Sequence, residues 1–184
     1  KTTLISMMAG LLEPDGGEIL LDGVPISGPG PDRGLVFQNY SLLPWLTVRG
    51  NVELGVGRVF SSLSVRERDE HVERYVDMVG LMPAIDKLPA ELSGGMRQRV
   101  ALIRTIMENR PVILMDEPFS SLDAITRVRM QDIASELLKD RTVLLITHDP
   151  MEALRLGDRI FILSGRPVKF SAPIVPRGSR PRSM

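Results

Sequence analysis

The amino-acid sequence predicts an α/β fold in which a mainly parallel sheet is interrupted by a block of helices. Short apolar runs alternate with segments of helical periodicity, as in parallel-sheet proteins, whereas residues 39–110 show helical patterns and turns. Two adjacent carboxylates, Asp116 and Glu117, directly follow the apolar run Val112–Met115. Four apolar residues in a row predict a strand buried on both faces. Its carboxyl end is where ligands bind in open α/β sheets.

Each predicted element follows from apolar spacing and from the turn residues that bound it. Ser64 to Glu67 is a capping-box pattern that begins a helix, and Gly10 with Pro14 ends the first one. In chain order we expect a helix over 1–12, strands over 18–23 and 34–38, an apolar connector over 40–48, helices over 65–79 and 95–109, a strand over 112–115, a helix over 124–138, a strand over 142–146, a helix over 150–156 and a strand over 159–163.

These elements divide the chain into three parts. Residues 1–38 and 111–165 form an α/β core, and residues 39–110 form an inserted helical subdomain. Residues 166–184 are rich in proline and arginine, and we expect a flexible, exposed tail because such a segment has little apolar surface to bury.

Composition narrows the possible functions. The 184 residues include 23 Lys and Arg and 23 Asp and Glu, so the net charge of zero does not indicate a nucleic-acid partner. The absence of cysteine excludes disulfides and cysteine-based metal sites. Apolar runs stay below the roughly 18 residues of a membrane span. The sequence begins at Lys1, inside what resembles a phosphate-binding motif, so we expect the start of the natural protein to lie upstream.

Lys1, Thr2 and Thr3 at the start of a helix match the end of a phosphate-binding loop, G-x-x-x-x-G-K-[ST]. In that loop the lysine reaches the β- and γ-phosphates and the hydroxyl contacts Mg²⁺. The helix amides add further donors, and Thr3 can bond another phosphate oxygen. Taken alone, the three residues also suit an ordinary helix N-terminus.

A second anion site is predicted at Ser93, Gly94 and Gly95. Ser93 is a favourable N-cap residue, and the two glycines let another molecule approach the backbone closely. Together they form a helix start at which an anion can bind. The alternative is an ordinary turn before an amphipathic helix.

Leu92–Met96 resembles the LSGGQ signature of the nucleotide-binding subunits of ABC transporters, with Met96 in place of the glutamine. Further family motifs follow in the expected order and cover residues 1 to about 165. Val112–Asp116 resembles the Walker B strand and Glu117 the catalytic glutamate after it, and Ser120–Asp123 resembles the D-loop. Gln38 matches the Q-loop glutamine, and His148 the switch histidine. The resemblance implies a P-loop NTPase (RecA-like) core.

The resemblance also implies roles for these residues. Two copies would pair head to tail, with one ATP held by Lys1, Thr2 and Thr3 of one copy and by Ser93, Gly94 and Gly95 of the other. Mg²⁺ would be held by Thr2, Gln38 and Asp116. Glu117 would accept a proton from water, His148 would stabilise the γ-phosphate, and Asp123 would couple the two sites. The alternatives without a catalytic or binding role are a polar strand end for Gln38, a capping or exposed histidine for His148, and a solvated strand end for Asp116 and Glu117.

The resemblance further implies partners: a second nucleotide-binding subunit, transmembrane permease subunits and, indirectly, a substrate-binding protein, at the cytoplasmic face of the cell (inner) membrane. The segment Tyr40–Leu46, which contains Trp45, would form a groove for a helix of the permease; the alternative is that Trp45 packs internally. Short matches resemble the nitrate, sulfonate and taurine importers, a branch that includes importers of thiamine precursors.

The alternative function is a non-transport ABC ATPase acting on nucleic acid or ribosomes, although long coiled-coil insertions and a basic patch are missing. Because the chain beginning at Lys1 lacks the glycines of the phosphate-binding loop, we expect that it does not bind Mg-ATP tightly by itself.

Overall fold

The computed structural model describes residues 1–37, 39–59 and 62–183, which form two compact units, Lys1–Ile146 and Thr147–Met184. The elements of the first unit are α1 (Thr2–Met8), β1 (Leu20–Leu21), β2 (Val24–Pro25), β3 (Arg33–Val36), α2 (Val48–Val59), α3 (Val65–Met78), the 3-10 helices Met82–Ala84 and Pro89–Glu91, α4 (Gly94–Met107), β4 (Val112–Asp116), α5 (Ala124–Leu137) and β5 (Thr142–Ile146). The elements of the second unit are α6 (Pro150–Leu156), β6 (Leu163–Ser164) and β7 (Lys169–Phe170).

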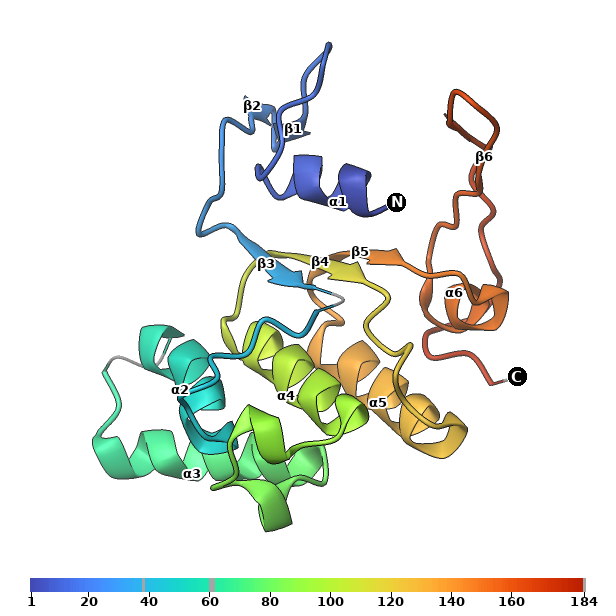
Figure 1. Ribbon diagram of the computed structural model, residues 1–184. Coiled ribbons are helices and arrows are strands. Elements are labelled where there is room, and N and C mark those ends of the chain that lie inside the picture. The colour runs from blue at the N-terminus through green and yellow to red at the C-terminus, as the bar shows by residue number, and fades with distance from the viewer. Residues whose placement is uncertain (38, 60–61, 184) are drawn as a thin grey trace. The chain divides into compact units, whose positions relative to one another are not determined.

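A parallel sheet of order β3-β4-β5 lies at the centre of the first unit. In this register Leu35 lies beside Leu114, and Leu114 beside Leu144. These three side chains pack on the side of α1, with Ile5 of that helix. Figure 1 shows α1 on one face of the sheet and α4 with α5 on the other. Both faces of β4 are therefore covered, which explains its uninterrupted apolar sequence and confirms the predicted α/β fold.

Helices α2, α3 and α4 pack against one another below this sheet, as Figure 1 shows. Gly55 of α2 lies directly against α4, where a Cβ atom would come within 2.6 Å of the carbonyl oxygen of Arg104. The missing side chain therefore lets the two helices approach closely. Val72 and Val76 of α3 are fully buried, as their helical spacing predicted, while Val65 at the start of that helix is exposed. The predicted capping box of Ser64 and Glu67 is present.

Helix α2 was not anticipated, because its sequence carries three glycines and only a weakly amphipathic pattern. Its key residue is Asn51, which is completely buried. The Asn51 side chain accepts a hydrogen bond from the amide of Leu43 (2.9 Å), and it donates to the carbonyl oxygens of Leu46 (2.9 Å) and Thr47 (3.1 Å). Asn51 thus connects α2 to the preceding irregular segment, an interaction that apolar periodicity does not reveal.

The second unit differs from its predicted secondary structure. The prediction of a strand over 159–163 is wrong: the segment holds an isolated bridge between Ile160 and Ile174, and the pairing of β6 with β7 begins only at Leu163. The reason is that Phe161 and Ile162 remain exposed rather than buried in the parallel sheet. The Pro/Arg-rich tail bonds to α6, since Arg182 donates to the carbonyl oxygens of Leu154 and Gly157 (both 3.0 Å).

The three-part division of the chain into core, helical subdomain and tail stays a prediction. Within the described residues, no helix combines the length and apolar character that crossing a membrane requires.

We predict that Asn51→Ala lowers the free energy of unfolding by about 1–3 kcal/mol, because it leaves buried backbone groups of the 43–47 segment without partners. Urea denaturation followed by circular dichroism measures the change. Glu53→Ala, at an exposed position of the same helix, is the matched control. Equal destabilisation by the two substitutions would contradict this role of Asn51.

Candidate functional site

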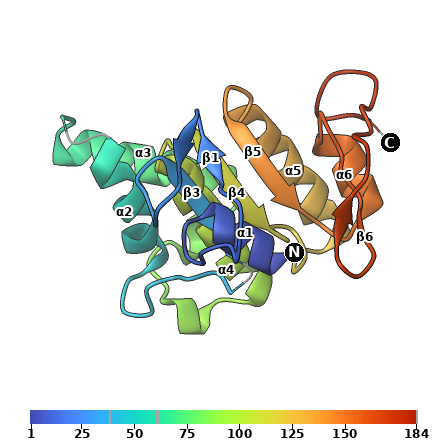
Figure 2. The same cartoon turned by 90° about the horizontal axis from the view of Figure 1, so that it is seen from above.

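Two of the predicted metal residues, Thr2 and Asp116, meet at the carboxyl edge of the sheet. Thr2, the first residue of α1, donates a hydrogen bond through its hydroxyl to a carboxylate oxygen of Asp116 at a distance of 2.8 Å. The two residues are 114 positions apart in the sequence. Figure 2 shows the N-terminal end of α1 at the end of β4. Asp116 is 4% exposed, whereas Lys1, Thr2 and Thr3 are open to solvent.

Asp116 and Glu117 separate into different environments at this edge. Asp116 still belongs to β4 and pairs in register with Ile146 of β5. Glu117 has a positive φ of 50°, a conformation that L-residues seldom adopt. Its amide donates to the carbonyl oxygen of Ile146 (2.9 Å). The chain therefore turns out of the sheet at Glu117, while Asp116 remains the last residue of the strand.

The loop over residues 117–123 leads from β4 to α5 and packs against the start of α4. The side chain of Gln98, on α4, donates to the carbonyl oxygen of Glu117 and accepts from the amide of Ser121, both at 2.9 Å. The phenol of Tyr40 lies 2.8 Å from the hydroxyl of Ser121. The guanidinium of Arg97 lies over the Tyr40 ring, 5.5 Å from its centre. Residues from two segments, α4 and the segment containing Tyr40, thus contact the 117–123 loop.

The turn predicted as a second anion site forms the N-terminus of α4. Ser93 is the N-cap, and its hydroxyl accepts a hydrogen bond from the amide of Met96 (3.3 Å). Gly94 and Gly95 form the first turn of the helix and are partly exposed. The structure therefore presents helix amides beside small residues at this point, an arrangement suited to an anion. Its use in nucleotide binding stays a prediction.

Asp123 closes the 117–123 loop as the N-cap of α5. The backbone amide of Thr126 donates to its carboxylate (3.0 Å), and this bond lowers the pKa of Asp123 below its ordinary value. The carboxylate of Asp123 is also exposed, and its role in coupling two copies stays a prediction.

The two remaining predicted residues are Gln38 and His148. Gln38 lies outside the described residues. His148 belongs to the second unit, where it directly precedes Asp149, the N-cap of α6. The amide of Asp149 donates to the hydroxyl of Thr147 (3.0 Å). The role of His148 beside a γ-phosphate, like that of Gln38 in a metal shell, stays a prediction.

Sequence reasoning missed Gln98 and Arg104, and it placed Tyr40 only in the predicted permease-docking segment. Arg104 on α4 donates to the carbonyl oxygen of Ser41 (2.8 Å), and burial lowers the pKa of its guanidinium. A signal for Gln98 does exist: it lies three and four residues before the buried Ala101 and Leu102, so it shares the apolar face of α4. Tyr40 and Arg104 have no comparable signal, because their partners are distant in the sequence.

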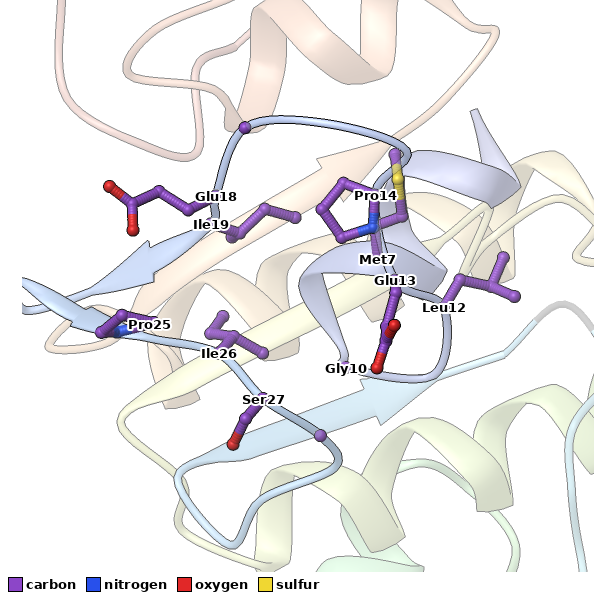
Figure 3. Close-up of a pocket in the computed structure, with 12 residues that line it drawn as sticks. Met7, Gly10, Leu12, Glu13, Pro14, Glu18, Ile19, Pro25, Ile26 and Ser27 are labelled. Atoms are coloured by element: carbon purple, nitrogen blue, oxygen red, sulfur yellow. The ribbon is translucent and has the colours of Figure 1, made fainter.

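A pocket of the first unit lies elsewhere, between the C-terminal end of α1 and the β1-β2 hairpin (Figure 3). Met7, Pro14, Ile19 and Ile26 contribute apolar surface to it, and Glu13 also lines it. The predicted phosphate residues lie at the opposite, N-terminal end of α1, so this pocket is separate from the candidate site.

Known proteins show which family has this arrangement. The family model described as ABC transporter matches residues 1–120. The chain belongs to the ABC transporter family. It shares 47% identity over 169 residues with an ATP-binding protein of Brucella abortus, covering 91% of this chain and 64% of that protein. The chain therefore spans less than two thirds of that relative.

Other ABC relatives carry names that refer to transport. A bicarbonate transport ATP-binding protein of Synechococcus elongatus is 47% identical, and a nitrate import ATP-binding protein of Synechocystis is 46% identical. Each match covers 91% of this chain, and 26% and 25% of the respective relative. Among solved structures, a dimeric ATP-binding cassette in a post-hydrolysis state with ADP and phosphate superimposes with a TM-score of 0.81 at 29% identity. That match covers 97% of this chain and 81% of the cassette. The resemblance to ABC transporters and the P-loop NTPase fold are thus confirmed.

We predict that Asp123→Asn reduces stability at neutral pH but not in acid. A lowered folded-state pKa means that the ionised form stabilises the fold above the ordinary pKa of 3.8, and that this contribution disappears as pH falls through the lowered value. Urea unfolding as a function of pH measures the difference between wild type and variant, which should shrink in acid. A difference independent of pH would contradict the assignment.

Proposed function

We propose that the protein is the ATP-hydrolysing subunit of an ABC importer for a small solute. The observation that carries this proposal is the hydrogen bond of 2.8 Å between Thr2 and Asp116, beside a glutamate that the backbone turns away from the sheet. A threonine hydroxyl at a helix start and a strand-end carboxylate are the groups that P-loop NTPases use around a metal-bound triphosphate.

The residues present suit a magnesium ion. The hydroxyl of Thr2 and the carboxylate of Asp116 are hard oxygen donors within hydrogen-bond distance of each other, and Mg²⁺ prefers such donors together with phosphate oxygens. Thr2 and Asp116 would hold the ion, with Gln38 completing its shell. Bound there, the ion would neutralise charge on the phosphate oxygens.

The other predicted residues would bind the nucleotide and act on the attacking water. Lys1 and Thr3 would bind phosphate oxygens of ATP, and the carboxylate of Glu117 would orient the attacking water and accept its proton. His148 would donate a hydrogen bond to the γ-phosphate as charge develops there. The exposed Ser93–Gly95 turn would bind the ATP of a second copy, so that two chains enclose each nucleotide between them. Asp123 would lie between the two sites of that dimer.

The transport assignment draws on the relatives. Two of them are named for nitrate import and bicarbonate transport, which supports a small solute such as nitrate, a sulfonate, taurine or a thiamine precursor. We propose permease subunits as direct partners and a substrate-binding protein as an indirect one, at the cytoplasmic face of the cell membrane. The Tyr40–Leu46 segment is the proposed docking surface, since the side chain of Trp45 is 71% exposed rather than packed internally.

Glu117→Gln tests the proposed catalytic base. The variant retains shape and hydrogen bonding but cannot accept a proton, so the ATP turnover number should fall by about 10²–10⁴. ATP should remain bound and should hold the dimer together in size-exclusion chromatography. Glu136→Gln, at an exposed position of α5, is the control. Turnover close to wild type in Glu117→Gln would refute the assignment of the base.

Trp45→Ala tests the docking surface. Removing the exposed indole should weaken co-purification with the permease subunits more than it lowers ATP turnover by the isolated subunit, because the ring packs little within its own chain. Leu54→Ala, at another exposed apolar position of the helical region, is the control. Equal loss of assembly and turnover, together with loss of folding, would show that Trp45 serves the internal packing instead.

A further inference from the structure

The structure contains a buried polar bridge that the proposed reaction does not use. Gln98 lies on α4, just beyond the Ser93–Gly95 turn, and is 2% exposed. Its amide nitrogen donates to the carbonyl oxygen of Glu117, and its amide oxygen accepts from the amide of Ser121, both at 2.9 Å. Buried amides need such partners. Here both partners belong to the 117–123 loop, so one side chain holds the two ends of its first turn.

The bridge acts on a strained point of the backbone. Glu117 has a φ of 50°, and residues in this region persist only where the surrounding structure holds them. The amide of Glu117 is held by Ile146, and its carbonyl oxygen accepts from the side chain of Gln98 (2.9 Å) and from the hydroxyl of Ser120 within the loop (3.0 Å). Without Gln98 the peptide after Glu117 loses its contact with α4. The direction of the Glu117 carboxylate would then be less well defined.

Two further contacts join the beginning of α4 to the same loop. A Cβ atom at Gly95 would lie 3.2 Å from the carbonyl oxygen of Ser121, so the helix start and the loop pack closely. The phenol of Tyr40 bonds the Ser121 side chain and lies beside Gly94. A movement of the Ser93–Gly95 turn therefore acts on Ser121 through close packing as well as through Gln98.

We propose that Gln98 is a positioning residue that couples the Ser93–Gly95 turn to the Glu117 carboxylate of the same chain. This inference rests on the proposed function. In the dimer, the turn would bind one ATP while Glu117 acts on the other, so Gln98 would link the two nucleotide sites through the interior of one subunit. Such a link is a coupling between two distinct sites.

Gln98→Leu is the main test, because leucine retains an apolar side chain of similar size and removes both hydrogen bonds. We expect the turnover number for ATP to fall about tenfold to a hundredfold, the loss that a misplaced catalytic group produces. The KM for ATP should change less than about twofold, and the cooperativity of hydrolysis should decrease. Hydrogen exchange at the Ser121 amide should accelerate.

Gln98→Glu separates positioning from packing. Its carboxylate can accept from Ser121 but cannot donate to Glu117, so turnover should fall at neutral pH. Protonation restores a donor, and turnover relative to wild type should therefore recover as pH is lowered. A side chain that only fills space would not produce this pH dependence, and its absence would overturn the proposal.

Gln131→Leu is the matched control. Gln131 is equally buried, on α5, and within the described residues its amide oxygen has no hydrogen-bond partner. This substitution should leave both turnover and Ser121 exchange close to wild type. If Gln98→Leu behaves like Gln131→Leu in both measurements, the positioning role is refuted.

Hydrogen exchange distinguishes failure of this inference from failure of the proposed function. If the wild-type protein does not hydrolyse ATP, the proposed function fails, but exchange at Ser121 still reports whether Gln98 holds the loop. If wild type hydrolyses ATP and Gln98→Leu does so with an unchanged turnover number and cooperativity, the coupling is refuted while the proposed function stands.

Discussion

The arrangement at the end of β4 depends on how the backbone of Glu117 is held. Its left-handed conformation takes the chain out of a parallel sheet at the point where that sheet ends. The Glu117 amide donates to the carbonyl oxygen of Ile146, and the Glu117 carbonyl oxygen accepts from Gln98 and from the hydroxyl of Ser120. As a result Asp116 remains in the sheet, beside Thr2, while Glu117 begins a loop of its own. Two adjacent carboxylates thereby acquire different surroundings.

The same loop connects the helical region to the sheet. α4 contributes the Ser93–Gly95 turn at its start and Gln98 shortly afterwards, and it also packs against β3. A helix that contacts both the sheet and the 117–123 loop can transmit small displacements, because packed interiors deform little. This property is what an ATPase with two interdependent nucleotide sites requires.

Sequence patterns predicted most of the central fold because its residues obey simple periodicities. β4 is apolar up to Asp116 because helices cover both faces of the sheet, and α3 shows its capping box and buried valines directly. α2 was not predicted, because its stability depends on the hydrogen bonds of Asn51 and on the close approach of α4 at Gly55. Both are tertiary features. The strand predicted over 159–163 does not form as expected. Its apolar residues Phe161 and Ile162 are exposed and are not packed against a core.

The sequence by itself determined the chemical inventory: a lysine and threonine at a helix start, a serine with two glycines at another, and two carboxylates after a buried strand. It also determined the family, because these motifs occur in a characteristic order. Only the tertiary structure decided which groups meet. The bond from Thr2 to Asp116 spans 114 positions, and the role of Gln98 depends on a loop about twenty residues away. Contacts of this kind arise from packing across the sheet, and local propensity carries no information about them.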